Sequence, residues 1–238
     1  MTTTQKTLIL IVFLLFLSAC SATPEAVQPT PKDPPATPPT YEESEVTYQN
    51  PSLPLHTIKL PEGFHISLFA TNIKGARSLE LTENGPASRT PSKNKGEGWT
   101  LFVGSRAEGK VYALKDRDGD FKADQVFTIA SGLESPNGVA FKDGNLYVTE
   151  ISRILRFDDI ENRLENPPAP VVVSDDFPTE THHGWKFIGI GPDDRLYVPV
   201  GAPCNICLSE DSLFASITSM ELDGSDRRIV ASGIRNTV

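Results

Sequence analysis

Residues 55–238 are predicted to form an all-β domain, and three observations support this fold class. Apolar runs of four to seven residues alternate there with Gly, Asp, Asn and Pro. The runs are rich in β-branched and aromatic residues, and turn pairs such as Asp143-Gly144 lie between them, which favours antiparallel strands. No window keeps an apolar period of 3.6 residues over the length of a helix.

The apolar runs predict a series of strands that repeats along the chain. In order, these strands are expected at residues 100–103, 110–114, 138–141, 145–148, 154–157, 195–200 and 217–222. Leu101, Leu146 and Leu196 each begin a similar strand, at separations of 45 and 50 residues. A period near 45 residues with four short strands per unit is typical of the blades of a β-propeller. At about 45 residues per blade, the domain has room for about four blades, and we expect an incomplete ring.

The first 19 residues have the pattern of a bacterial lipoprotein signal peptide. Lys6 precedes an apolar run from Leu8 to Leu17, which is too short to span a bilayer as a helix. The segment Leu17-Ser18-Ala19-Cys20 resembles a lipoprotein cleavage box, so we expect lipid on Cys20 and a membrane anchor. An ordinary signal peptide with an incidental cysteine is the alternative. Ser21 favours sorting to the outer membrane, on the periplasmic side of the bacterial cell envelope.

Residues 20–54 are predicted to be an extended tether between the lipid and the domain. Nine of the 20 prolines fall between Pro24 and Pro54. Proline fixes φ and lacks a backbone donor, so this composition disfavours both helix and sheet. The formal charge of the whole chain is −9, which argues against nucleic acid as a partner.

Polar motifs precede or follow several of the predicted strands. His182 and His183 are adjacent and stand just before the segment that leads into the strand at 195–200, and Arg235-Asn236 lie about fifty residues further on. In a propeller, residues that enter an innermost strand lie at the mouth of the central channel, where ligands bind. We therefore expect a ligand site at these residues.

With these motifs, the sequence resembles the soluble quinoprotein sugar dehydrogenases, most closely their sorbosone dehydrogenase-like branch. The resembling pieces are Gly75–Ser78, Gly104–Arg106, Lys110–Tyr112, Pro136–Phe141, His182–Trp185, Gly201–Cys207 and Gly233–Asn236. This resemblance implies a six-bladed propeller of the quinoprotein glucose dehydrogenase type, with pyrroloquinoline quinone (PQQ) and calcium as cofactors. The pieces cover roughly residues 60–238 and the N-terminal half of the family's domain, so we expect an N-terminal fragment of such a propeller.

The resemblance also implies roles for individual residues. The position of the family's general base falls on His183, and an imidazole suits this role because it exchanges protons near neutral pH. Arg235 and Asn236 match the pair that contacts the quinone, and a guanidinium suits the carboxylates and carbonyls of PQQ. Asn137 is a weaker candidate for a cofactor contact. His182 is expected to orient its surroundings, because alternate residues of a strand face opposite ways.

An acidic motif is a weak candidate for a metal site. Its carboxylates are those of Asp116, Asp118, Asp120 and Asp124. Closely spaced carboxylates suit calcium, but Phe121 and Phe127 stand where an EF-hand loop needs Gly and Glu. A solvated hairpin turn is the favoured interpretation. The calcium of the family is expected to take its ligands mostly from outside this chain.

Cys204 and Cys207 form a C-x-x-C motif, and Leu208 excludes attachment of a c-type haem, which needs His at that position. In an exported protein the pair is expected to form a disulfide. A zinc site with His182 and His183, and a free redox-active pair, are the alternatives.

The function that we predict is oxidation of an aldose, a sugar aldehyde or a related polyol by an exported, PQQ-dependent oxidoreductase. The partners are then a small sugar, an electron acceptor that the sequence does not identify, and the membrane reached through Cys20. A metal-dependent lactonase of propeller fold and a non-catalytic binding propeller are the alternatives. We expect this chain by itself to be inactive, because the family draws further cofactor contacts from later blades.

Overall fold

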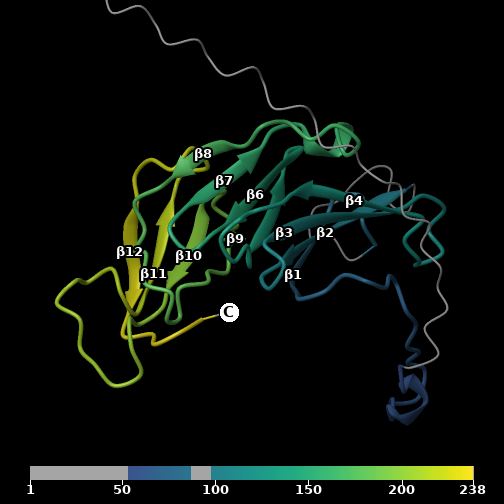
Figure 1. Ribbon diagram of the computed structural model, residues 1–238, viewed down its shortest axis with the longest axis horizontal. Helices are drawn as coiled ribbons and strands as arrows, with labels where there is room; N and C mark the ends of the chain where they lie inside the picture. Colours follow the sequence, from purple (N-terminus) through teal and green to yellow (C-terminus); the bar gives the residue numbers. More distant parts are fainter. Residues whose placement is uncertain (1–52, 87–97, 238) are drawn as a thin grey trace, which may run out of the picture. The chain divides into compact units, whose positions relative to one another are not determined.

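The computed structural model describes residues 53–86 and 98–237, and the fold of these residues is all-β, as predicted (Figure 1). Two short 3₁₀ turns, η1 (Leu55–Thr57) and η2 (Ile160–Asn162), accompany twelve strands in three antiparallel sheets. The predicted signal peptide, Cys20 and most of the predicted tether lie outside the described residues. Within the described ranges, no helix is both long and apolar enough to cross a membrane.

Each sheet is a meander of four strands that pair in the order of the chain. The first sheet contains β1 (Ala76–Leu81), β2 (Trp99–Ser105), β3 (Lys110–Asp116) and β4 (Gln125–Ala130). The second contains β5 (Val139–Lys142), β6 (Asn145–Thr149), β7 (Ile154–Phe157) and β8 (Val171–Ser174). The third contains β9 (Gly189–Ile190), β10 (Leu196–Val200), β11 (Ser216–Met220) and β12 (Arg228–Ser232). We refer to these sheets as the first, second and third blades.

The seven strands expected from apolar runs are β2, β3, β5, β6, β7, β10 and β11. The other five strands, β1, β4, β8, β9 and β12, were not predicted, although β8 begins with three valines and β4 contains Val126, Phe127 and Ile129. Strands β1 and β12 mix charged with apolar residues, and β9 has only two residues. The estimate of about four blades counted residues 55–75, which contain the η1 turn and no strand. The described residues form three complete four-stranded sheets.

The blades pack face to face, because successive side chains of a strand point to opposite faces of its sheet. In β5, Val139 and Phe141 join a core cluster with the first blade, where Phe102 stacks on Phe141 with ring centroids 5.5 Å apart. Ala140, between them in the chain, joins a second cluster with residues of the third blade such as Val198. The second blade is therefore buried on both faces, as a blade within a propeller must be.

The first strands of the three blades lie next to one another: β1 contacts β5, and β5 contacts β9. At this inner edge the backbones approach closely. A Cβ atom added to Gly138 would lie 2.7 Å from the backbone nitrogen of Ile188 and 2.8 Å from the backbone oxygen of Lys186. Neighbouring blades therefore meet at their first strands, which is the radial arrangement that a propeller requires.

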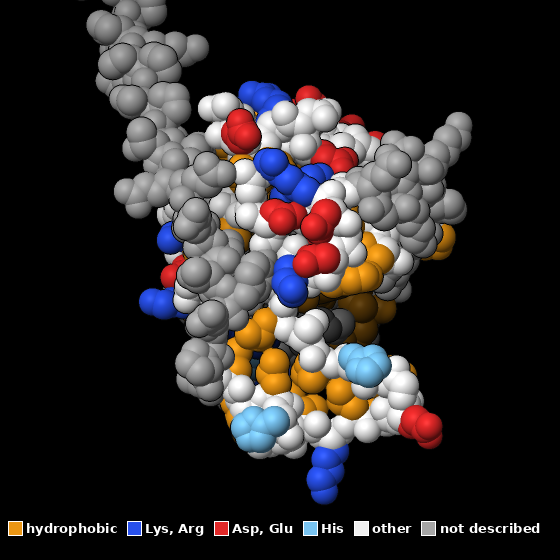
Figure 2. Space-filling view, turned by 90° about the vertical axis from the view of Figure 1, so that its right-hand side faces the viewer, with side chains coloured by type: hydrophobic (Ala, Val, Ile, Leu, Met, Phe, Trp, Pro, Cys, Tyr) orange, Lys and Arg blue, Asp and Glu red, His pale blue; other side chains and the backbone are white. Residues whose placement is uncertain are grey.

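The other face of the first blade is covered only in part. Phe69, Ala70 and Ile73 pack on this face beside Leu101 and Val126. Leu79 in β1 remains 59% exposed there, beside a hollow of about 380 Å³. Figure 2 shows hydrophobic side chains on the side of the molecule where the first blade lies. An open set of blades leaves such an apolar face.

Candidate active site

Motifs that lie far apart in the sequence meet at one end of the blades. Ser105 at the end of β2 pairs with both Ala76 and Lys110, so the loop after β2 leaves the sheet where β1 begins. Neighbouring strands of each sheet run in opposite directions. The loops after β6 and β10 and the segments before β5 and β9 therefore lie at this same end of the blades. These loops and the segment after β12 contain Gly104–Arg106, Pro136–Gly138, His182–Trp185, Gly201–Cys207 and Gly233–Asn236. We call this end of the blades the motif end.

His183 is held in a tight turn before β9. The N–H of Gly184 donates to the carbonyl of Thr181 over 3.1 Å, and His183 itself has a left-handed φ of +53°. The His183 ring is buried, and its Nδ1 lies 2.9 Å from the carbonyl oxygen of Ala202. Because a carbonyl only accepts, Nδ1 carries the proton. With the proton on Nδ1, Nε2 is the ring nitrogen that is able to accept a proton from a ligand.

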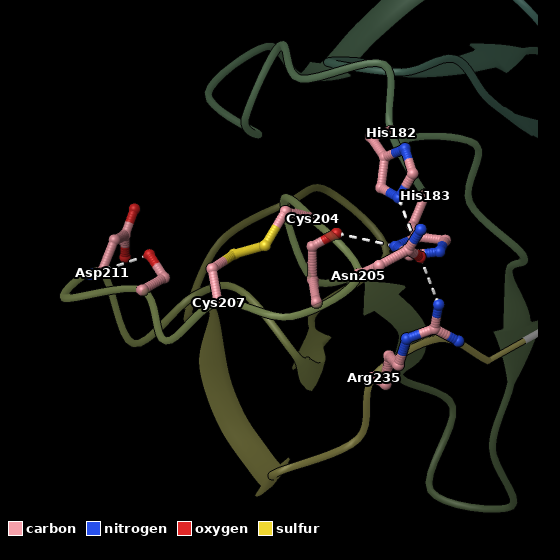
Figure 3. Close-up of a disulfide and its surroundings, with 9 residues drawn as sticks. His182, His183, Cys204, Asn205, Cys207, Asp211 and Arg235 are labelled. Carbon is pink, nitrogen blue, oxygen red and sulfur yellow. Dashed lines mark hydrogen bonds between the residues drawn. A yellow bond between two sulfur atoms is a disulfide. The ribbon is translucent and has the colours of Figure 1, made fainter.

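His182 also lies in this turn and not in a strand, so the expectation that its side chain and that of His183 face opposite ways was wrong. A strand would separate the two side chains, whereas the turn brings the rings of His182 and His183 edge to edge, with centroids 4.1 Å apart. Nε2 of the exposed His182 donates over 3.2 Å to Oδ1 of Asn205 (Figure 3). His182 therefore orients toward the loop after β10.

Arg235 follows β12 and lies beside the two histidines. Its carbonyl accepts the backbone N–H of Ala202 over 2.7 Å, and its guanidinium Nη2 donates to Oδ1 of Asn205 (Figure 3). Asn236 also lies close, since a Cβ added to Gly201 would be 3.3 Å from Asn236 Oδ1 and 2.5 Å from His183 Cβ. The structure thus brings His183, Arg235 and Asn236 together around residues 201–202.

Asn137 lies between the blades and is only 2% exposed. Its side-chain N–H donates over 3.1 Å to the carbonyl of Lys186, and this carbonyl also accepts the hydroxyl of Thr149 over 2.7 Å. Among the described residues, Oδ1 of Asn137 has no hydrogen-bond partner. These bonds tie the second blade to the segment that enters the third, and a cofactor contact by Asn137 stays a prediction.

Arg106 and Trp185, which stand in the resembling pieces but were given no role from the sequence, also lie at the motif end. The guanidinium of Arg106 sits 3.9 Å from the ring centre of Trp185, a cation–π contact. The Trp185 ring is in turn 6.3 Å from the His183 ring. Nε1 of Trp185 is buried and finds no acceptor within the described ranges. Loops of the first and third blades therefore place a cation and an N–H donor beside the histidine.

The acidic motif is the turn between β3 and β4, at the other end of the blades. Carboxylate oxygens of Asp116, Asp118 and Asp120 lie within 4.8 Å of one another. Asp116, which is buried, accepts the N–H groups of Gly119 and Phe121 over 2.7 and 3.0 Å. Asp124 accepts the N–H of Arg117 over 2.6 Å. The length of β3, roughly 20 Å at about 3.3 Å per residue, separates this turn from the motif end.

Cys204 and Cys207 are joined by a disulfide in the loop after β10 (Figure 3). The two sulfur atoms are thus not available as zinc ligands in this structure. The disulfide closes a ring around Asn205 and Ile206, and we call residues 204–207 the disulfide loop. Asn205 is the member of this loop that reaches His182 and Arg235.

Lys186 is a buried cation next to the motif end, two residues after Gly184. It is 2% exposed, and its Nζ donates to the carbonyl of Gly184 over 3.0 Å and to the carbonyl of Ile151. Nζ also lies 5.4 Å from the ring centre of Phe177. Burial lowers the pKa of Lys186 to about 8, against the partly compensating charges of Glu180 and Glu134.

We expect this buried amine to make stability rise with pH above pH 8. The pKa of Lys186 is about 8 in the folded state, below the ~10.4 of an unfolded lysine. Between these values the unfolded state binds more protons, so the free energy of unfolding increases as the pH rises. The wild type should gain up to about 3 kcal/mol relative to Lys186→Met from pH 7 to pH 10. Urea unfolding of both proteins measures this difference, and a flat or falling difference would contradict the expectation.

Comparisons with known proteins agree with this fold. No protein-family model matches the chain. An uncharacterized protein of Borreliella burgdorferi is 22% identical over an alignment of 196 positions, and the match covers 76% of this chain and 45% of that protein. The PQQ domain of pyranose dehydrogenase from Coprinopsis cinerea, solved in its holo form, matches with a TM-score of 0.59 and 14% identity, over 76% of this chain and 44% of that domain.

The PQQ-bound aldose sugar dehydrogenase of Streptomyces coelicolor is also similar, with a TM-score of 0.46 and 24% identity over 67% of this chain and 48% of that protein. The chain spans less than half the length of each of these three proteins. The likeness to the pyranose dehydrogenase domain, at 14% identity, shows the fold alone: the three sheets are consecutive blades of a β-propeller.

Proposed function

We propose that the protein to which this chain belongs is an exported PQQ-dependent oxidoreductase that oxidises an aldose, a sugar aldehyde or a related polyol. The observation that supports this most is the set of hydrogen bonds that joins the histidine turn to Arg235. The carbonyl oxygen of Ala202 lies 2.9 Å from Nδ1 of His183, and the backbone N–H of Ala202 donates to the carbonyl of Arg235 over 2.7 Å. Asn205 binds both His182 and the exposed guanidinium of Arg235, on a propeller of the kind seen in a PQQ domain.

The donors at the motif end fit the chemistry of PQQ, whose edge carries carboxylates and carbonyl oxygens. The guanidinium of Arg235 is exposed and suits carboxylate oxygens. The buried Nε1–H of Trp185 lacks an acceptor among the described residues, and Arg106 adds a second guanidinium beside it. Gly201 has no side chain to fill the space between His183 and Asn236. We propose that Arg235, Asn236 and Trp185 hold the cofactor.

The described residues contain no calcium site comparable to the proposed PQQ site. Their one group of three or more close carboxylate, imidazole or thiol ligands is Asp116, Asp118 and Asp120. This group lies at the other end of the blades, and Asp116 already binds two backbone N–H groups. The proposed mechanism therefore gives calcium no part among the described residues.

The proposed mechanism uses Nε2 of His183 as the general base. A sugar hydroxyl that reaches Nε2 gives up its proton there while hydride leaves the carbon that bears the hydroxyl. When bound, PQQ supplies the quinone that accepts this hydride. Ala202 keeps the Nδ1 proton of His183 in place, so that the ring presents its basic nitrogen to the substrate. Positioned proton removal of this kind typically contributes ~10²–10⁴ in rate.

We further propose that the protein is anchored through lipid on Cys20, on the periplasmic face of the outer membrane. The support is the pattern of residues 1–19 and the proline-rich sequence after them. The proline-rich segment would let the propeller stand away from the membrane surface.

The proposal is tested with the natural gene product that contains this sequence, reconstituted with PQQ and Ca²⁺. We expect PQQ-dependent reduction of an artificial electron-accepting dye when aldoses are supplied. Hydrolysis of sugar lactones without PQQ would instead identify a lactonase. Absence of both activities, in a preparation shown to be folded, would leave a binding propeller and overturn the proposal.

A further inference from the structure

The disulfide loop presents one polar side chain to the candidate active site. Oδ1 of Asn205 lies 3.2 Å from Nε2 of His182 and also accepts Nη2 of Arg235 (Figure 3). Both partners are donors, so the amide oxygen of Asn205 must face them. Asn205 therefore connects the turn before β9 with the segment after β12.

The hydrogen bonds of Asn205 are exposed to solvent, so they last only if the groups that form them are held in position. His182, Asn205 and Arg235 are all exposed. An exposed arginine loses much rotamer freedom when it is held in one position, and water competes for its hydrogen bonds. An acceptor that is already held in place lowers this cost, because only the arginine side chain then has to be ordered.

The fold supplies such support on both sides of Asn205. Before Asn205, the backbone of Ala202 is bonded to the Nδ1 of His183 and to the carbonyl of Arg235. After it, the disulfide between Cys204 and Cys207 closes the loop. The loop has no apolar anchor of its own, since Ile206 is 97% exposed. The disulfide thus substitutes for packing at this point.

We propose that Asn205 is a positioning residue of the candidate active site, and that the disulfide loop holds it in place. Asn205 orients the guanidinium of Arg235 and fixes His182 with its proton on Nε2. This inference rests on the proposed function for the ligand that Arg235 meets, a carboxylate of the quinone, but the positioning itself requires no ligand.

The test is side-chain NMR of the ligand-free chain, labelled with ¹⁵N in arginine and histidine. The signals of Arg235 are assigned by their loss in Arg235→Lys, and those of His182 by their loss in His182→Gln. We compare the wild type with Asn205→Ala, with Cys204→Ser/Cys207→Ser, and with Asn205→Asp, which keeps an acceptor. Ile206→Ala is the matched control, because it changes the same loop without removing a contact. Thiol titration of the unreduced wild type verifies the disulfide, and amide spectra verify folding.

In Asn205→Ala we expect rotation of the Arg235 guanidinium to become about 5–10-fold faster, as for the loss of one hydrogen bond. The His182 ring should change from a single Nε2–H tautomer to a mixture. The double serine variant should show both changes, and Asn205→Asp and Ile206→Ala should show neither. Unchanged Arg235 and His182 signals in either Asn205→Ala or the serine variant would overturn the proposal.

A second measurement separates this inference from the proposed function. In the natural gene product, Asn205→Ala should weaken PQQ binding by about 5–10-fold, again the loss of one hydrogen bond. If the NMR changes occur and PQQ affinity is unaltered, Asn205 is still a positioning residue and the proposed ligand is wrong. If the NMR signals do not change, the positioning role is wrong whatever the affinity for PQQ.

Discussion

Replacing His183 with asparagine is expected to lower the turnover of the reconstituted enzyme by about 10²–10⁴, because the variant lacks the nitrogen that takes the proton. Asparagine is chosen because it tolerates the left-handed φ of +53° at this position. Its side-chain amide also retains a donor for the carbonyl of Ala202, which His183 binds through Nδ1. The substitution therefore removes Nε2 with little change to the fold. Steady-state kinetics with PQQ and an aldose measure the effect.

The matched control for this substitution is Asp159→Asn. Asp159 also has a left-handed φ, of +51°, but it is the N-cap of the η2 turn in the connection between β7 and β8, away from the motif end. We expect this variant to keep the turnover of the wild type. A His183→Asn enzyme that retained more than about a tenth of wild-type turnover would be outside the range for a lost general base, and His183 would then not be the base.

Replacing Gly138 with alanine is expected to destabilise the fold by about 2–3 kcal/mol, the range for overpacking a close contact. The added Cβ would lie 2.7 Å from the nitrogen of Ile188 and 2.8 Å from the oxygen of Lys186. Both are backbone atoms at the entry to the third blade, so no change of rotamer relieves the clash. The melting temperature should fall by roughly 5–10 °C. Calorimetry of the 238-residue chain measures this change.

Gly189→Ala provides the control, in the neighbouring strand β9. A Cβ there would meet only the ring of Phe187, at an ordinary 3.5 Å, and Gly189 does not have a positive φ. We expect its melting temperature to stay close to that of the wild type. Equal melting temperatures for both variants would show that the second and third blades do not meet backbone to backbone at Gly138.

The two middle strands of each blade were predictable from the sequence, and the outer strands β4, β8 and β12 were not. In β6, Leu146 and Val148 face one core and Tyr147 faces the other, so three consecutive residues are apolar and buried. In β12, by contrast, Ile229 and Val230 are 41% and 47% exposed and stand beside Arg228. An outer strand needs little apolar surface, so its pattern is too weak to identify it.

The residues of the candidate site that belong to a recognisable sequence motif were predictable from the sequence. His183, Arg235 and Asn236 were selected from short motifs, and the structure places them around Gly201 and Ala202. Asn205 was within the quoted segment Gly201–Cys207 but received no role, because nothing local shows which side chain a loop will present. The role given to His182 assumed a strand where the chain makes a turn.

By itself the sequence determined the all-β class, the repeat and the residue types that suit proton transfer and a carboxylate-rich ligand, because these depend on local pattern and side-chain chemistry. Only the tertiary structure decided which of these residues meet. Arg106 reaches Trp185 from another blade, and Asn205 reaches both His182 and Arg235. Such contacts join residues 23 to 79 positions apart. The first contact follows from the packing of blade on blade, and the other two follow from the antiparallel pairing of β9–β12, which brings alternate loops to one end. Neither cause is encoded in a single segment of the chain.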